Sequence, residues 1–162
     1  MSRIILVVSL AVLPGFGASS FAQTQRFSLV GVWKIAELQA ATGAATTNPQ
    51  AGLFIFTTKH YSMIFVEGTE PRPEFELPQA TASELLAMLG PFAAQAGTYE
   101  FEGNELTVHP IVAKSPRAMR GNSTIYEVMK DGEAIWLRPK PETGGSSPYW
   151  RKWPRMKLAR IE

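Results

Sequence analysis

"FSLVGVWKIAELQA", residues 27–40, combines a strand-like pattern with a glycine two positions before a tryptophan. Glycine weakens a strand because it adds backbone entropy and brings no side chain to pack. Side chains alternate between the two faces of a strand, so Gly31 and Trp33 share a face. The pattern therefore indicates a place where a large ring needs space beside it. We interpret Trp33 as a plug at one end of a small closed barrel, with Gly31 making room for the ring.

The rest of the chain is rich in short strand-like runs separated by turn residues. Asp131-Gly132 is the strongest hairpin signal, and Gly103-Asn104 is a second two-residue turn that tolerates positive φ. The expected strands are 29–39, 53–57, 61–67, 98–102, 105–112, 123–130, 133–138 and the final run "SSPYWRKW" at 146–153. About eight antiparallel strands joined in sequence commonly close into an up-and-down barrel. The sequence thus predicts an all-β, eight-stranded antiparallel barrel with a short helical insertion.

The helical insertion is expected at residues 81–96, where "TASELLAMLGPFAAQA" is rich in Ala and Leu. Thr81 or Ser83 caps its start. Gly90-Pro91 breaks or kinks it, so one short helix or two result. The insertion either acts as a lid or closes the end of the barrel.

Residues 1–22 have the pattern of a secretory signal peptide. Arg3 gives a positive start, residues 4–13 are apolar, and Ser20-Phe21-Ala22 places small residues where signal peptidase cuts. The apolar run is too short to span a bilayer, which needs about 20 residues. A buried N-terminal helix or strand is the alternative. We expect no transmembrane segment and a secreted or periplasmic mature chain that begins near Gln23.

Composition argues against several functions. The formal net charge of +2 is too small to suggest nucleic-acid binding, and the chain has no cysteine for disulfides. Its histidines are His60 and His109, and its single aspartate, Asp131, is explained by a turn. No metal-ligand spacing, phosphate-binding loop or catalytic triad is present, so we expect no metal and no cofactor. Haem held by His109 is the alternative that a barrel leaves open.

Three sequence elements together resemble a known family. Gly31-Val32-Trp33 near the start of an eight-strand pattern is similar to the G-x-W element of the lipocalin superfamily. The stretch "GTYEFEG" at 97–103 and the hairpin at 126–132 followed by Leu137 resemble the bacterial lipocalin-like domain family. The resemblance covers most of the chain after the signal peptide.

The resemblance implies a lipocalin-like barrel domain at 27–155, followed by a basic C-terminal tail at 156–162. It also implies that a basic side chain from the last strand lies over Trp33. Arg151 is the best match, with Lys152 the alternative if the register differs by one. The family implies a ligand-binding or structural barrel and no particular reaction.

Candidate ligand contacts are aromatic and polar residues that strand alternation groups on common faces, a mixture typical of small-molecule sites. The candidates are Tyr61, Tyr99, Tyr126, Trp136 and Arg138. An arginine inside a barrel needs a partner, for which Glu100, Glu127, a tyrosine hydroxyl or a ligand carboxylate are available. A fatty acid with its head at Arg138 is therefore one hypothesis. The alternative is that Arg138 points to solvent and the aromatics are ordinary core residues.

Two functions from different classes follow. The first is an exported barrel that binds a small hydrophobic or amphipathic molecule. The second is a barrel enzyme of the isomerase or cyclase type acting on a lipid-like substrate, with Tyr99, His109 or Tyr126 as acid or base. A structural barrel without ligand, or a surface-interaction module using the basic tail, are the lesser alternatives. The sequence does not specify an oligomeric state.

Overall fold

The computed structural model describes residues 27–76, 78–141 and 151–162, so the expected signal peptide lies outside the described residues. Its elements, in chain order, are β1 (Gly31–Gln39), β2 (Ala45–Thr46), β3 (Gly52–Phe56), β4 (His60–Val66), α1 (Ala82–Leu89), β5 (Phe92–Glu102), β6 (Glu105–Ala113), β7 (Thr124–Asp131), β8 (Ala134–Pro139) and β9 (Arg155–Arg160).

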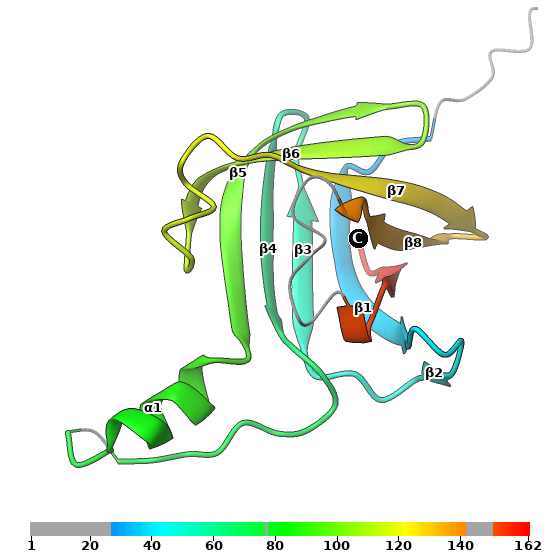
Figure 1. The fold of residues 1–162 in the computed structure, drawn as a ribbon. Helices are drawn as coiled ribbons and strands as arrows, with labels where there is room; N and C mark the ends of the chain where they lie inside the picture. Colours follow the sequence, from blue (N-terminus) through cyan, green and yellow to red (C-terminus); the bar gives the residue numbers. More distant parts are fainter. Residues whose placement is uncertain (1–26, 77, 142–150) are drawn as a thin grey trace, which may run out of the picture.

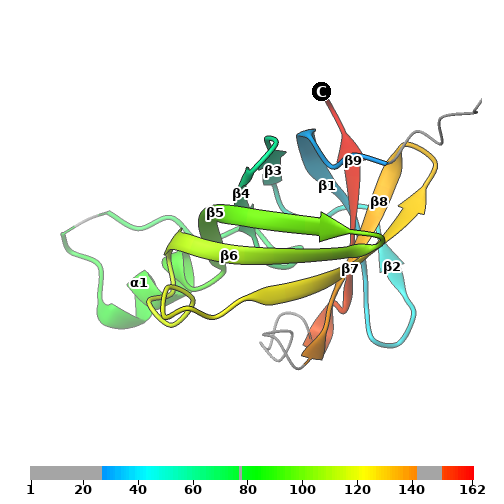
Figure 2. The same cartoon turned by 90° about the horizontal axis from the view of Figure 1, so that it is seen from above.

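The strands form a closed antiparallel barrel. Strands β1, β3, β4, β5, β6, β7, β8 and β9 follow one another around the sheet, and β9 returns to pair with β1. Short β2 adds only to the end of β1, where Leu38 pairs with Thr46. Figures 1 and 2 show β9 between β1 and β8, completing the ring. The predicted all-β, eight-stranded antiparallel barrel is confirmed.

Strand alternation fills the barrel with apolar side chains. On β4, for example, Tyr61, Met63 and Phe65 are buried, whereas His60 before them and Ile64 between the last two are exposed. The same alternation on the other strands builds one continuous core. The buried core comprises Leu29, Trp33, Ile35, Leu38, Phe54, Phe56, Tyr61, Met63, Phe65, Leu106, Val108, Tyr126, Val128, Ile135, Leu137, Met156 and Leu158.

The helix is shorter than the sequence predicted. Thr81 caps α1 in a capping box with Glu84, and the helix ends at Leu89, so residues 92–96 are not helical but open β5. This part of β5 pairs with β4 on one side and β6 on the other, as in Ala93↔Phe65 and Gln95↔Ala113. Pairing on both edges outweighs the helix propensity of an alanine-rich segment, because tertiary context overrides intrinsic propensity.

The last strand also differs from the prediction. It is β9 at Arg155–Arg160, which lies almost wholly in the segment 156–162 that the sequence assigned to a basic tail, whereas residues 151–153 of the expected final run are not in a strand. Residues 146–150 of that run lie outside the described residues. Met156 and Leu158 are completely buried and alternate with basic residues that face outward. The segment is therefore a half-buried strand. Its sequence resembles a basic tail because it contains more basic residues than large apolar ones.

One end of the barrel is closed around Trp33. The indole is fully buried and its Nε1 donates a hydrogen bond to the Leu29 carbonyl at 2.8 Å. The guanidinium of Arg160 lies 5.2 Å from the centre of the Trp33 ring, so Arg160 takes the place predicted for Arg151. Arg151 is exposed and lies before β9. The prediction failed because the last strand lies closer to the C-terminus than the sequence suggested.

The glycine before the tryptophan has a related explanation. Gly31 has φ +142°, and a Cβ there would meet the Glu162 carbonyl oxygen and would lie 2.8 Å from Nη2 of Arg160. The space beside Trp33 is therefore filled by the C-terminal strand and its arginine, and not by the indole itself as the sequence suggested. Gly31 permits β1 and the end of β9 to approach closely.

Candidate ligand-binding site at the open end of the barrel

A pocket of about 330 Å³ lies at the end of the barrel opposite Trp33. It forms where β4 ends and β5 begins, and the β6–β7 loop contributes Ser115 and Ala118 to its wall. Its described lining consists of Phe65, Glu67, Gly90, Phe92, Ala93, Ala94, Gln95, Ala113, Lys114, Ser115, Ala118, Thr124 and Tyr126. Apolar and aromatic side chains with a few polar groups are the usual make-up of a small-molecule site.

The inner wall of the pocket carries neutral hydrogen-bonding groups. The Tyr126 hydroxyl is hydrogen-bonded to the Gln95 side chain, and the Gln95 amide also approaches the sulfur of Met63 at 3.7 Å. Burial raises the pKa of Tyr126, and the hydrogen bond from Gln95 opposes this shift. Tyr126 therefore stays protonated at neutral pH and can donate or accept a hydrogen bond.

Tyr61 lies deeper in the same core. Its side chain is only 3% exposed, and its hydroxyl has no hydrogen-bond partner among the described residues. Burial raises the pKa of Tyr61, and the nearby Tyr126 raises it further. An unsatisfied buried hydroxyl costs free energy, so this group is an available contact for a polar atom that enters the core.

Two charged residues stand at the rim. Glu67 continues the inward face of β4 two residues after Phe65, and burial raises the pKa of its carboxyl while Lys114 opposes the shift. Lys114 follows β6 and its ammonium donates hydrogen bonds to the carbonyl oxygens of Leu89, Gly90 and Phe92. These bonds tie the C-terminal end of α1 to the mouth of the barrel.

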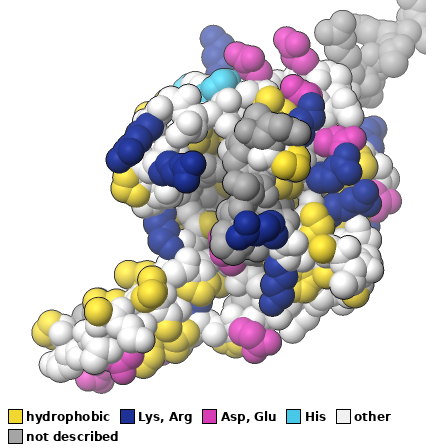
Figure 3. All heavy atoms as spheres, viewed as in Figure 1, with side chains coloured by type: hydrophobic (Ala, Val, Ile, Leu, Met, Phe, Trp, Pro, Cys, Tyr) yellow, Lys and Arg dark blue, Asp and Glu magenta, His cyan; other side chains and the backbone are white. Residues whose placement is uncertain are grey.

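Helix α1 projects from the barrel (Figure 1), and Figure 3 shows hydrophobic side chains gathered on this lobe. None of its residues is buried, and Leu86 is 73% exposed. A second pocket of about 640 Å³ runs between α1 and Trp153 and shares Glu67 and Gly90 with the first. The helix thus extends the apolar surface of the mouth rather than capping the core.

The structure separates the five candidate ligand contacts. Tyr126 lines the pocket and Tyr61 lies in the core near it. Tyr99 packs edge-on against Phe56 toward the Trp33 end, and its hydroxyl donates to the Thr57 carbonyl at 2.6 Å. Only the first two are therefore placed to serve the mouth pocket.

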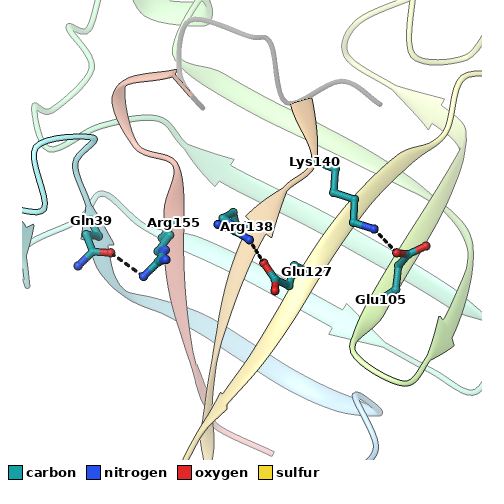
Figure 4. Close-up of polar contacts among 6 residues, drawn as sticks. All are labelled: Gln39, Glu105, Glu127, Arg138, Lys140 and Arg155. Atoms are coloured by element: carbon teal, nitrogen blue, oxygen red, sulfur yellow. Dashed lines mark hydrogen bonds and ion pairs between the residues drawn. The ribbon is translucent and has the colours of Figure 1, made fainter. Parts of the chain in front are cut away.

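Trp136 and Arg138 lie on the outer face of β8, because Ile135, Leu137 and Pro139 occupy its buried face. The Arg138 side chain is 49% exposed and forms an ion pair with Glu127, one of the partners expected from the sequence. Figure 4 shows this pair on neighbouring strands beside the Arg155–Gln39 and Lys140–Glu105 contacts. Arg138 therefore does not receive a ligand carboxylate inside the barrel, and Trp136 instead packs with Lys157 and Asp131.

The residues named for an enzyme do not come together. Tyr126 lines the mouth pocket and Tyr99 bonds to a turn at the other end, whereas His109 is exposed on β6. No cluster of three or more His, Asp or Glu side chains suited to a metal ion occurs in the described residues. Within the same residues, no helix has the length and apolarity that crossing a membrane requires.

The lining residues that were missed from the sequence include Glu67, Gln95 and Lys114. Every second residue of β4 points inward, as Tyr61, Met63 and Phe65 do. Continuing this alternation by two residues predicts that Glu67 also points inward. Gln95 was concealed by the helical interpretation of its segment. Nothing in the sequence indicates that Lys114 turns toward the end of α1.

Comparison with known proteins identifies a structural likeness alone. No family model matches the sequence, and no curated protein matches it. Among solved structures, a lipocalin-like protein from Bacteroides uniformis ATCC 8492 has 14% sequence identity and a TM-score of 0.44. The alignment covers 82% of this chain and 98% of that chain.

Proposed function

We propose that this protein is an exported barrel that binds a small hydrophobic or amphipathic molecule in the mouth pocket. The observation that supports the proposal is the juxtaposition of apolar lining, from Phe65, Ala93 and Ala118, with the Gln95–Tyr126 hydrogen bond at the inner wall. The apolar surface gains free energy when it is covered by a ligand tail. The amide and hydroxyl fix the orientation of one polar atom.

The size of the pocket sets the class of ligand. A volume of about 330 Å³ is at the lower end of the range of small-molecule sites, which is roughly 300–1,000 Å³. The core below it is filled by Met63, Tyr61 and their neighbours. A medium-length aliphatic chain or one or two rings therefore suits the site better than a long lipid inserted to the Trp33 end.

Ala93→Leu tests the proposal by filling the pocket from within. Ala93 lies on the inner face of β5, so the added carbons occupy the space of the ligand. We expect binding of 1-decanol, followed by amide chemical shifts of Gln95 and Tyr126, to be lost in this variant. Ala96→Leu is the matched control, because Ala96 lies on the same strand but faces outward opposite Ser62.

Thermal unfolding of both variants shows that each is folded before binding is compared. Equal binding of 1-decanol to the native chain and to Ala93→Leu would place the ligand elsewhere. Absence of binding to the native chain would instead favour a structural barrel without ligand.

A further inference from the structure

The mouth pocket contains one carboxylate that makes no hydrogen bond or ion pair with a described residue, and its charged neighbour in the pocket is Lys114. Glu67 is partly buried and lines both the first pocket and its neighbour. Its backbone N–H donates to the Pro91 carbonyl at 2.8 Å, but its carboxylate makes no hydrogen bond or ion pair with any described residue. A half-buried charge without a partner has lost part of its hydration, and a cation that reached it would restore that loss.

The lysine at the same rim is already committed. An ammonium group has three donors, and Lys114 directs its donors to the carbonyls of Leu89, Gly90 and Phe92. Two of these carbonyls lie at the C-terminal end of α1, where the helix dipole is negative. The three hydrogens of Lys114 are therefore occupied by these carbonyls and are not available to an anionic ligand.

The other polar groups of the first pocket are uncharged. They are Gln95, Ser115, Thr124 and Tyr126, and no other charged side chain belongs to the described lining. Arg138, which would have received an anionic head, lies on the outer face and pairs with Glu127. In the first pocket, Glu67 is thus the charged side chain whose polar atoms make no hydrogen bond with a described residue, and Lys152 lines the adjoining pocket.

The apolar and charged parts of the site are suitably arranged for one molecule. Phe65 and Ala93 line the wall below Glu67, and the exposed side of α1 adds Leu86 in the adjoining pocket. An aliphatic chain placed on this wall brings its head group to the level of Glu67. Resting on the proposed function, we infer that the mouth pocket prefers amphipathic amines, whose ammonium group pairs with the Glu67 carboxylate.

Three probes of equal chain length test this inference: decylamine, 1-decanol and decanoate, titrated at neutral pH and low salt below their aggregation concentrations. We expect decylamine to bind more tightly than decanoate by on the order of tenfold, the size of effect that a partly exposed charge pair produces. 1-Decanol should bind with an intermediate affinity, because it shares the tail contacts but carries no charge.

Glu67→Gln keeps the shape of the side chain and removes its charge. The preference for decylamine over decanoate should disappear in this variant. Glu70→Gln is the matched control, because Glu70 lies in the same loop but does not line either pocket. The preference should be unchanged there.

The outcomes separate the two proposals. Tighter binding of decanoate than of decylamine, or an amine preference that survives in Glu67→Gln, would overturn the amine inference while leaving the binding function in place. Loss of decanoate binding in Lys114→Met would identify the lysine as the head-group contact instead. Failure of all three probes to bind the native chain would overturn the binding function itself.

Discussion

The guanidinium of Arg160 stacks over the ring of Trp33, 5.2 Å from its centre, and thereby joins the first and last strands of the barrel. The same guanidinium donates hydrogen bonds to the carbonyls of Val30, just before β1, and Glu162, just after β9. An arginine in this position combines cation–π attraction with two backbone contacts. Arg160 therefore connects Trp33 on β1 to β9, the strand that closes the barrel.

A double-mutant cycle measures this relationship. Trp33→Ala should lower the free energy of unfolding by about 3–5 kcal/mol, as removal of a large core aromatic does. Arg160→Ala should cost less, and its cost should shrink by about 0.5 kcal/mol or more when Trp33 is already absent, because contacting residues are not additive. Urea unfolding of the four proteins provides the energies.

Arg151→Ala is the control for this cycle, since Arg151 is exposed and lies outside β9. Its effect should be within about 0.5 kcal/mol of zero and independent of Trp33. Strict additivity of Trp33→Ala and Arg160→Ala would show that the stacking contributes nothing to stability.

The hairpins were predictable because local chemistry determines them. Asp131 pairs with Ala134 across a tight turn, and Glu102 pairs with Glu105 across Gly103-Asn104. In both cases the turn residues sit between strands that alternate apolar and polar side chains. Neither prediction required knowledge of distant parts of the chain.

The errors arose where distant partners decide the outcome. Ala93 and Gln95 belong to a segment with high helix propensity, and only pairing with β4 and β6 makes it a strand. Met156 and Leu158 are two apolar residues in a basic run. They belong to the core because their strand, β9, pairs with β1 on one side and β8 on the other. Of the five candidate contacts, only Tyr126 and Tyr61 lie at or near the mouth pocket, because inward and outward faces depend on closure of the barrel.

The N-terminal segment leads to a prediction about export. We propose that residues 1–22 are removed, because Ser20 and Ala22 fit the small-residue rule of signal peptidase. Intact-mass analysis of protein recovered from the periplasm or medium should give a chain that begins at Gln23. Ala22→Arg should block cleavage and leave the precursor unprocessed. Recovery of the native chain uncleaved in the cytoplasm would contradict the proposal.

Glu67 predicts a pH dependence of stability. Burial raises the pKa of its carboxyl above the ordinary value of 4.5, with Lys114 opposing the shift. The folded state therefore binds the proton more tightly than the unfolded state, and the free energy of unfolding falls as pH rises from 4.5 through the raised pKa. Urea unfolding at a series of pH values should show this decline, superimposed on the effects of the other carboxyls.

Glu67→Gln should remove the part of this decline that comes from Glu67. The free energy of unfolding of the variant should therefore increase relative to that of the native chain as pH rises from 4.5 through the raised pKa. Glu84 shows the opposite sign, because the Thr81 backbone and side-chain hydrogen bonds lower its pKa, and its contribution is lost as pH falls. A difference curve for Glu67→Gln that is flat between pH 4 and 7 would mean that the carboxyl is fully hydrated.

The two buried tyrosines predict opposite responses to loss of a hydroxyl. The Tyr61 hydroxyl has no partner among the described residues, whereas that of Tyr126 is hydrogen-bonded to Gln95. Tyr61→Phe should raise the free energy of unfolding by about 1–3 kcal/mol, because it removes an unsatisfied buried polar group while keeping the ring. Tyr126→Phe should lower it by about 0.5–1.5 kcal/mol, the net value of one hydrogen bond. Both variants keep the core volume, so urea unfolding of the ligand-free mature chain isolates the hydroxyls. Destabilisation by Tyr61→Phe would show that an internal water satisfies this group, and the ligand would then have to displace it.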